Sequence, residues 1–155
     1  MASWRQAPIF WLLAAILCIG TDLSNALADP IGTVTKVVNE AQVGTKTAGP
    51  RTPIYMDDRL RTGSNARLQV TFRDSSVLTL GEKANVIVDR YVFDPEKSKG
   101  QVVLKSTQGA FRFAGGQIKQ MSDRQITVNT PAAALAVRGT EFWGAQSTAN
   151  TGCFC

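Results

Sequence analysis

Residues 66–80 read ARLQVTFRDSSVLTL, and their pattern indicates the fold class. In its first half Leu68, Val70 and Phe72 alternate with polar residues, which is the period of a strand with one buried and one wet face. Asp74 and Ser75 then interrupt the alternation, and both favour tight turns because their side chains bond the neighbouring backbone. The alternation resumes at residue 77. The stretch therefore predicts two strands joined by a turn.

The same rhythm continues from residue 31 onward. Short apolar alternations are broken by glycine, proline, asparagine or aspartate roughly every 8–12 residues, and no helical period of useful length appears. This pattern predicts an all-β domain. Strands are expected over Gly32–Asn39, Thr52–Tyr55, Ala66–Phe72, Val77–Leu80, Asn85–Phe93, Gln101–Ser106, Gly109–Phe113, Gln125–Asn129 and Ala134–Val137. The expected core contains Leu68, Val70, Phe72, Leu78, Leu80, Val86, Val88, Val103, Phe111 and Val128.

The first 28 residues are typical of an export signal. Arg5 supplies a weakly basic start, and an unbroken apolar run extends from Ile9 to Ile19. That run is shorter than the roughly 20 residues that a membrane span needs, and Ala26-Leu27-Ala28 fits the A-x-A cleavage rule. We expect a signal peptide over 1–28 and a mature chain in the periplasm or outside the cell, with membrane contact only through the signal. The alternative is an uncleaved helix anchored in the inner membrane.

Residue types argue against enzymatic chemistry. The 155-residue chain has no histidine, so it lacks the commonest general base and zinc ligand, and Ser-His and Cys-His catalysis are excluded within the chain. Once the signal is removed, only Cys153 and Cys155 remain, and they imply no disulfide framework. The carboxylates occupy turn-like settings. We therefore predict no enzyme, no catalytic residue, no metal site and no cofactor.

The basic excess does not indicate a nucleic-acid binder. The net charge is +5, but the arginines fall on many different segments instead of one face. A modest charge that keeps an exported domain soluble is the favoured interpretation. Gly115-Gly116 beside Arg112 and Lys119 could form an anion-binding nest of backbone amides, although a flexible turn is favoured there.

Two longer patterns go beyond generic strands. The first, L-x-T-G-x-x-A-x-L, covers 60–68, and the second, T-P-x-A-x-x-x-V-R-G-T, covers 130–140. In the first, a glycine able to take positive φ is expected to let the Leu60 strand reverse into the Ala66 strand. In the second, extended backbone precedes the proline, and the later glycine allows a change of direction. The positions singled out as structural are Thr62, Gly63, Asp74, Thr130, Pro131, Arg138, Gly139 and Thr140.

Together these patterns resemble the FecR domain family over roughly 32–143. The resemblance implies one FecR-like β domain over 29–143, either a compact β-sandwich or a short β-solenoid, preceded by the signal-peptide helix. It also implies a non-enzymatic binding or signal-receiving module whose partner is a cell-envelope protein or glycan. The alternative is a structural component of the envelope or matrix without a discrete ligand. FecR-type regulators carry a cytoplasmic segment, which is not recognised here, so sigma-factor signalling is not implied.

The last residues differ from the rest of the chain in composition and patterning. Residues 144–155 are polar and small and show no alternation, so we expect a disordered tail or a truncated product. If later strands are missing, the strand after Pro131 has an open edge around Leu135–Phe142. Such an edge is predicted to favour self-association by strand addition.

Overall fold

The computed structural model describes residues 28–137, 141–146 and 152–154. The predicted signal peptide up to residue 27 and Arg138–Thr140 lie outside the described residues. Among the described residues, no helix is long and apolar enough to cross a membrane. The elements are β1 (Gly32–Val38), β2 (Ala41–Val43), β3 (Lys46–Thr47), β4 (Pro53–Ile54), β5 (Arg59–Thr62), β6 (Arg67–Phe72), β7 (Val77–Leu80), β8 (Asn85–Asp94), β9 (Lys99–Ala114), η1 (Gln117–Gln120), β10 (Asp123–Asn129), β11 (Ala134–Val137), β12 (Glu141–Gln146) and β13 (Gly152–Phe154).

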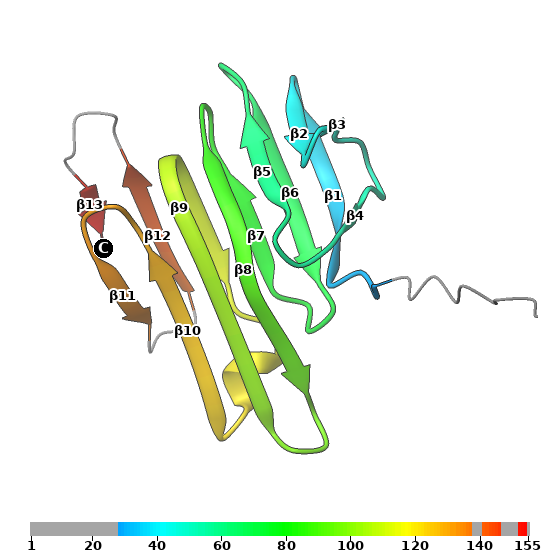
Figure 1. Ribbon diagram of the computed structural model, residues 1–155, viewed down its shortest axis with the longest axis vertical. Helices are drawn as coiled ribbons and strands as arrows, with labels where there is room; N and C mark the ends of the chain where they lie inside the picture. Colours follow the sequence, from blue (N-terminus) through cyan, green and yellow to red (C-terminus); the bar gives the residue numbers. More distant parts are fainter. Residues whose placement is uncertain (1–27, 138–140, 147–151, 155) are drawn as a thin grey trace, which may run out of the picture.

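The strands form one sheet that curls over into a half-barrel (Figure 1), which confirms the predicted all-β class. Its β6 half has the order β4-β1-β6-β7-β9-β12-β13. Its β8 half has the order β3-β2-β5-β8-β9-β10-β11. Neighbouring strands are antiparallel except β9 and β10, which run parallel. Strand β9 belongs to both halves and therefore connects them.

A glycine allows β9 to pass from one half to the other. Residues 99–108 of β9 pair with β8, and residues 109–114 pair with β12. Gly109 has φ +81°, and a Cβ there would lie 2.3 Å from Ala84 Cα. Only glycine fits both the backbone conformation and the close approach. The prediction of two separate strands, 101–106 and 109–113, is therefore wrong, because the glycine bends the strand without ending it.

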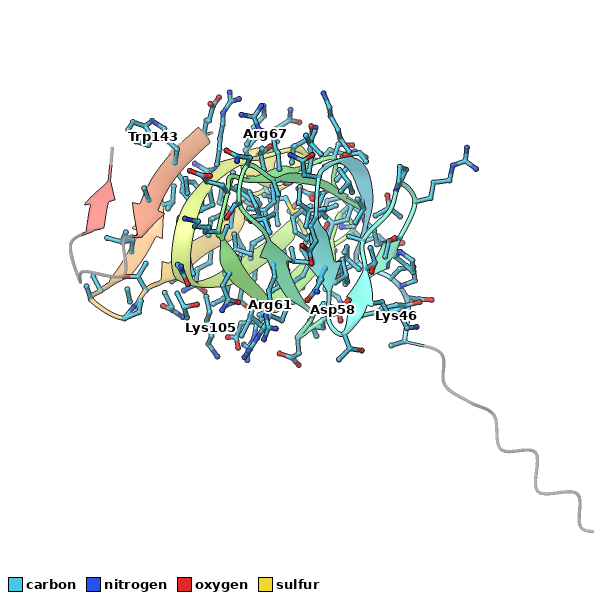
Figure 2. All side chains as sticks on the ribbon, turned by 90° about the horizontal axis from the view of Figure 1, so that it is seen from above. Lys46, Asp58, Arg61, Arg67, Lys105 and Trp143 are labelled. Carbon is cyan, nitrogen blue, oxygen red and sulfur yellow. The ribbon has the colours of Figure 1, made fainter. Side chains whose placement is uncertain are left out.

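The hydrophobic core lies between the two halves (Figure 2). The predicted core residues are buried except Val103, which is half-buried, while its neighbours Val102 and Leu104 are fully buried. Three consecutive apolar residues, Val102, Val103 and Leu104, do not show from the sequence alone which of them face the core. The prediction assigned Val103 to the core side, which is wrong. The largest fully buried side chains come from both halves and include Phe113, Ile54, Leu60, Leu68, Leu78, Leu80, Leu104 and Ile118.

An irregularity in β8 changes which side chains face the core. The pairing of β8 with β9 shifts register between Val88 and Arg90, as a β-bulge does. After this shift Tyr91 is buried at 7% exposure and Val92 is only half-buried. The alternation of Val86 and Val88 would place Val92 on the same buried face if it continued, but it breaks at the bulge. As a consequence, the Tyr91 hydroxyl reaches the interior.

Two strands, β12 and β13, include residues that the sequence predicted to lie in a disordered tail. Strand β12 continues through Gln146 in register with β9, and β13 pairs with β12. Phe142 packs with ring centroids 5.4 Å from Phe113 and 6.0 Å from Phe111. The expectation of a disordered tail is thus wrong for 144–146, which pair with β9, and for 152–154, which pair with β12. Strand pairing orders these segments although their own side chains carry no apolar alternation. Strands β2 and β3 were not predicted, because segments of two or three residues are too short to show a period, whereas β5 corresponds to the expected strand that contains Leu60.

Candidate functional site

Asp74 is the centre of a buried hydrogen-bond network in the β6–β7 turn. Its carboxylate is fully buried, and Oδ1 accepts hydrogen bonds from the Tyr91 hydroxyl at 2.9 Å and the Ser76 backbone N–H at 3.3 Å. Oδ2 accepts from the Ser76 hydroxyl and from the Ile118 backbone N–H at 3.3 Å. The Asp74 backbone N–H in turn donates to Tyr91 Oη at 3.0 Å. Because these donors satisfy the carboxylate, it can remain buried.

The segment after Gly115-Gly116 closes this network from the other side. The backbone N–H of Gly116 donates to Ser76 Oγ at 2.9 Å, and that of Gln117 donates to the Asp74 carbonyl at 2.7 Å. A Cβ at Gly116 would lie 2.0 Å from the Asp74 carbonyl oxygen, so only glycine permits this approach. The flexible-turn interpretation is therefore wrong. The successive N–H groups of Gly116, Gln117 and Ile118 donate to the protein's own Asp74–Ser76 turn and not to a separate anion.

Tyr91 is held as a neutral hydrogen-bond donor. Burial raises the pKa of Tyr91 above its ordinary value of 10.0, and the nearby Asp74 carboxylate raises it further. The ring also stacks on Phe72 with centroids 5.3 Å apart. The network thus ties the β6–β7 turn, strand β8 and helix η1 together.

Thr62 and Gly63 lie at a second crossing between the halves. Thr62 is buried, and its Oγ1 donates to the Gly81 carbonyl at 2.6 Å and accepts from the Ala84 N–H at 2.8 Å. Gly63 does not take positive φ; Asn65 does, with φ 53°. The expected reversal of the Leu60 strand into the next is also wrong, because β5 pairs with β8 and β6 pairs with β1. The turn instead carries the chain from one half to the other.

Thr130 and Pro131 form the turn between β10 and β11. The Thr130 N–H donates to the Ala133 carbonyl at 2.8 Å, and the Ala133 N–H donates to Thr130 Oγ1 at 3.1 Å. Pro131 is the second of four residues, where its fixed φ suits a turn. The β6–β7 turn is near the bottom of Figure 1 and the β10–β11 turn is nearer the top. The predicted positions therefore support separate turns and do not converge on one site.

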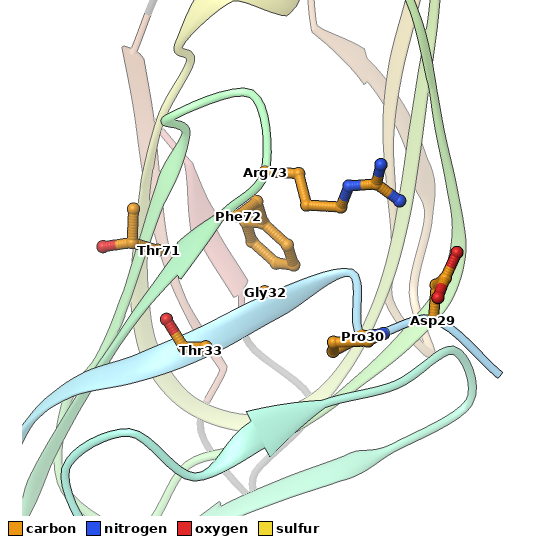
Figure 3. Close-up of a pocket in the computed structure, with 7 residues that line it drawn as sticks. All are labelled: Asp29, Pro30, Gly32, Thr33, Thr71, Phe72 and Arg73. Atoms are coloured by element: carbon orange, nitrogen blue, oxygen red, sulfur yellow. The ribbon is translucent and has the colours of Figure 1, made fainter. Parts of the chain in front are cut away.

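An open hollow of about 450 Å³ lies where β1 begins and β6 ends (Figure 3). It brings one carboxylate, one guanidinium and two threonine hydroxyls together with apolar surface. Its lining residues are Asp29, Pro30, Gly32, Thr33, Thr71, Phe72 and Arg73. Among the described residues, no group of three histidine, cysteine, aspartate or glutamate residues could hold a metal ion. The hollow offers hydrogen-bonding groups without a nucleophile joined to a base.

A continuous row of side chains crosses the outer face of the β6 half. Register places Lys36 beside Gln69, Gln69 beside Thr79, Thr79 beside Arg112, and Arg112 beside Trp143. We call these five residues the outer row. Trp143 is 48% exposed, and Arg112 forms an ion pair with Glu141. Figure 2 shows Trp143 and Arg67 on this face, with Arg61 and Lys105 on the opposite one.

A family model described as FecR protein matches residues 58–153. The chain belongs to the FecR family. No curated protein and no solved structure matched the chain. The FecR match contains Thr62, Gly63, Asp74, Thr130 and Pro131, and it ends within β13, the last described strand. It begins later and ends later than the span of the resemblance seen in the sequence.

Sequence reasoning found Asp74 in this FecR domain but missed its partners. Ser76, Tyr91 and Gly116 each contribute to the network. Ser76 and Tyr91 were not singled out, and Gly116 was considered only as part of a flexible turn or an anion-binding nest. One signal was available, because a tyrosine in a core strand needs a hydrogen-bond partner for its hydroxyl. The bulge in β8 concealed that Tyr91 faces inward.

Proposed function

We propose that this FecR-family chain is exported and acts as a non-enzymatic binding or signal-receiving module in the periplasm or outside the cell. The outer row is the observation that carries the proposal. It presents a half-exposed tryptophan next to an arginine, and these two residue types dominate the binding energy of protein interfaces.

The outer row is held rigidly by the fold. Each member lies on a strand, and the opposite face of the same strands fills the core with Val70, Leu78 and Phe113. A partner therefore meets side chains whose backbone is already ordered, so little backbone entropy is lost on binding. This arrangement favours recognition by a preformed surface over induced folding.

We propose a cell-envelope protein as the partner, because tryptophan and arginine are enriched at protein interfaces. The alternative partner, a glycan, would stack a sugar ring on Trp143 and bond its hydroxyls to Gln69 and Thr79. We do not propose nucleic acid, because the exposed charges of the β8 half are mixed, with Lys105 paired to Asp89. Export is supported by the apolar run and A-x-A triplet at the start of the chain. Cleavage before Asp29 would leave the whole sheet intact, since β1 begins at Gly32.

Capture from envelope extracts tests the proposal. The purified chain, Trp143→Ser and the control Arg61→Ser, whose exposed side chain lies on the opposite face, are each immobilised and exposed to increasing amounts of extract. We expect the parent chain and the control to capture one component saturably and Trp143→Ser to lose it. Treating the extract with a protease or a glycosidase tells which class of partner is bound. Diffuse, unsaturable association that is equal in all three chains would instead favour the structural envelope component.

A further inference from the structure

Strand β11 directs unpaired backbone groups away from the sheet. Among the described residues, β11 pairs only with β10. The Thr130 N–H bonds the Ala133 carbonyl, and hydrogen-bonded pairs alternate with non-bonded pairs along an antiparallel ladder. Leu135 therefore exchanges its backbone bonds with β10, whereas Ala134 and Ala136 point theirs outward.

Nothing in the sequence of β11 protects this edge. Residues 131–137 read PAAALAV, with no charge between Pro131 and Val137. The Ala134 and Ala136 side chains are exposed, and those of Leu135 and Val137 are half-buried on the side of the core. Proteins commonly blunt an edge strand with lysine, proline or a bulge. This strand has none of them, so its backbone is open to pairing.

The opposite end of the sheet, unlike β11, is protected against pairing with another strand. There, residues 48–52 cross between β2 and β1, with the Arg51 N–H donating to the Val34 carbonyl and the Ala48 N–H to the Ala41 carbonyl, both at 2.8 Å. The exposed charged side chains of Lys46 and Arg51 lie at this end. Strands β11 and β13 lie at the far end (Figure 1). One end is thus covered and charged, whereas at the other end none of the described strands pairs with the outer edge of β11.

We propose that β11 pairs antiparallel with β11 of a second copy of this chain, about a two-fold axis. Both outward-facing residues are used when Ala134 lies opposite the second copy's Ala136, which also places the two Leu135 side chains opposite each other. Rotation within the plane of the sheet keeps Leu135 and Val137 on the core side in both copies. A second copy fits because the edge is uncharged and therefore does not repel itself.

This association is separate from the proposed partner surface. The outer row lies on the β6 half, while β11 belongs to the β8 half. A failure of self-pairing therefore leaves envelope capture untouched, and a failure of capture leaves self-pairing untouched.

Sedimentation equilibrium over a wide range of protein concentration tests the pairing, with a reductant present to exclude links through Cys153 and Cys155. We expect a reversible monomer–dimer equilibrium. Ala136→Pro removes an outward N–H without breaking the β10 ladder, so it should raise the dimer Kd about tenfold or more, because each copy loses a donor. Ala136→Ser, which keeps the N–H, should match the parent chain. A chain that is monomeric at every concentration, or dimerisation equal in both variants, would overturn the proposal.

A charge swap keeps the test valid if proline disturbs the fold. Ala136→Lys and Ala136→Glu each place like charges close together across the proposed pairing, so each should dimerise more weakly than the parent chain. An equimolar mixture should recover dimerisation, because opposite charges then meet. Mixing without recovery would show that the contact lies elsewhere and would contradict pairing through β11.

Discussion

Replacing Tyr91 with phenylalanine removes one oxygen from the Asp74 network and leaves the ring in place. The lost hydroxyl donates to the buried carboxylate at 2.9 Å and accepts from the Asp74 N–H at 3.0 Å. A hydrogen bond to a charged group contributes about 1.5–3 kcal/mol, and a buried unsatisfied N–H costs about 1–3 kcal/mol. Burying phenylalanine costs less desolvation free energy than burying the tyrosine hydroxyl, and this offsets part of the loss. The stacking on Phe72 stays, so no cavity forms. We expect Tyr91→Phe to lower the free energy of unfolding by about 2–4 kcal/mol.

Urea denaturation followed by circular dichroism measures this loss. The midpoint should fall while the slope stays constant, because the surface exposed on unfolding is nearly unchanged. Tyr55→Phe is the matched control, since Tyr55 is 37% exposed and surface changes usually stay within about 0.5 kcal/mol. If Tyr91→Phe destabilised no more than this control, the carboxylate would not depend on the phenol and the account of the network would be wrong.

Three further predictions follow from the same contacts and from the start of the chain. Gly116→Ala should lower the free energy of unfolding by about 1–3 kcal/mol or more, because its Cβ would lie 2.0 Å from a backbone oxygen. In the same urea assay the control Gly49→Ala should change the free energy of unfolding little, since the nearest atom to its Cβ is 4.0 Å away. Because the pKa of Tyr91 is raised in the folded chain, its contribution to stability is complete below the ordinary pKa of about 10 and declines as the pH rises above it. In Tyr55→Phe, phenolate absorbance should therefore appear together with loss of structure. Ionisation of Tyr91 in an intact fold near pH 10 would contradict this. N-terminal sequencing of the exported protein should start at Asp29, and a membrane-bound form that keeps residues 9–19 would contradict export as a soluble chain.

The sequence predicts the part of the fold where side chains alternate cleanly. Leu68, Val70 and Phe72 are buried as expected, and Asp74 and Ser75 form the expected turn, with Ser75 at φ 65°. Prediction failed where the backbone departs from a regular strand. The bulge before Tyr91 reverses which face is buried, and the bend at Gly109 redirects β9 without ending it.

Long-range contacts were beyond sequence reasoning for a different reason. The partners of Asp74 include Tyr91 and Ile118, which are 17 and 44 residues away in the chain. Nothing local to Asp74 shows that a backbone amide so distant will reach its carboxylate. The outer row has the same origin, because Lys36 and Trp143 share a face only through the registers of five strands. Trp143 in isolation carries no such information.

The most direct test of the proposed function is a binding isotherm for the captured envelope component on the parent chain and on Trp143→Ser. We expect saturation with one dissociation constant for the parent chain. In Trp143→Ser this constant should rise about thirtyfold or more, the loss expected when an interface hot spot worth about 2 kcal/mol is removed. Arg61→Ser should bind like the parent chain. Isotherms that coincide for all three chains, or that never saturate, would contradict a binding module that acts through the outer row.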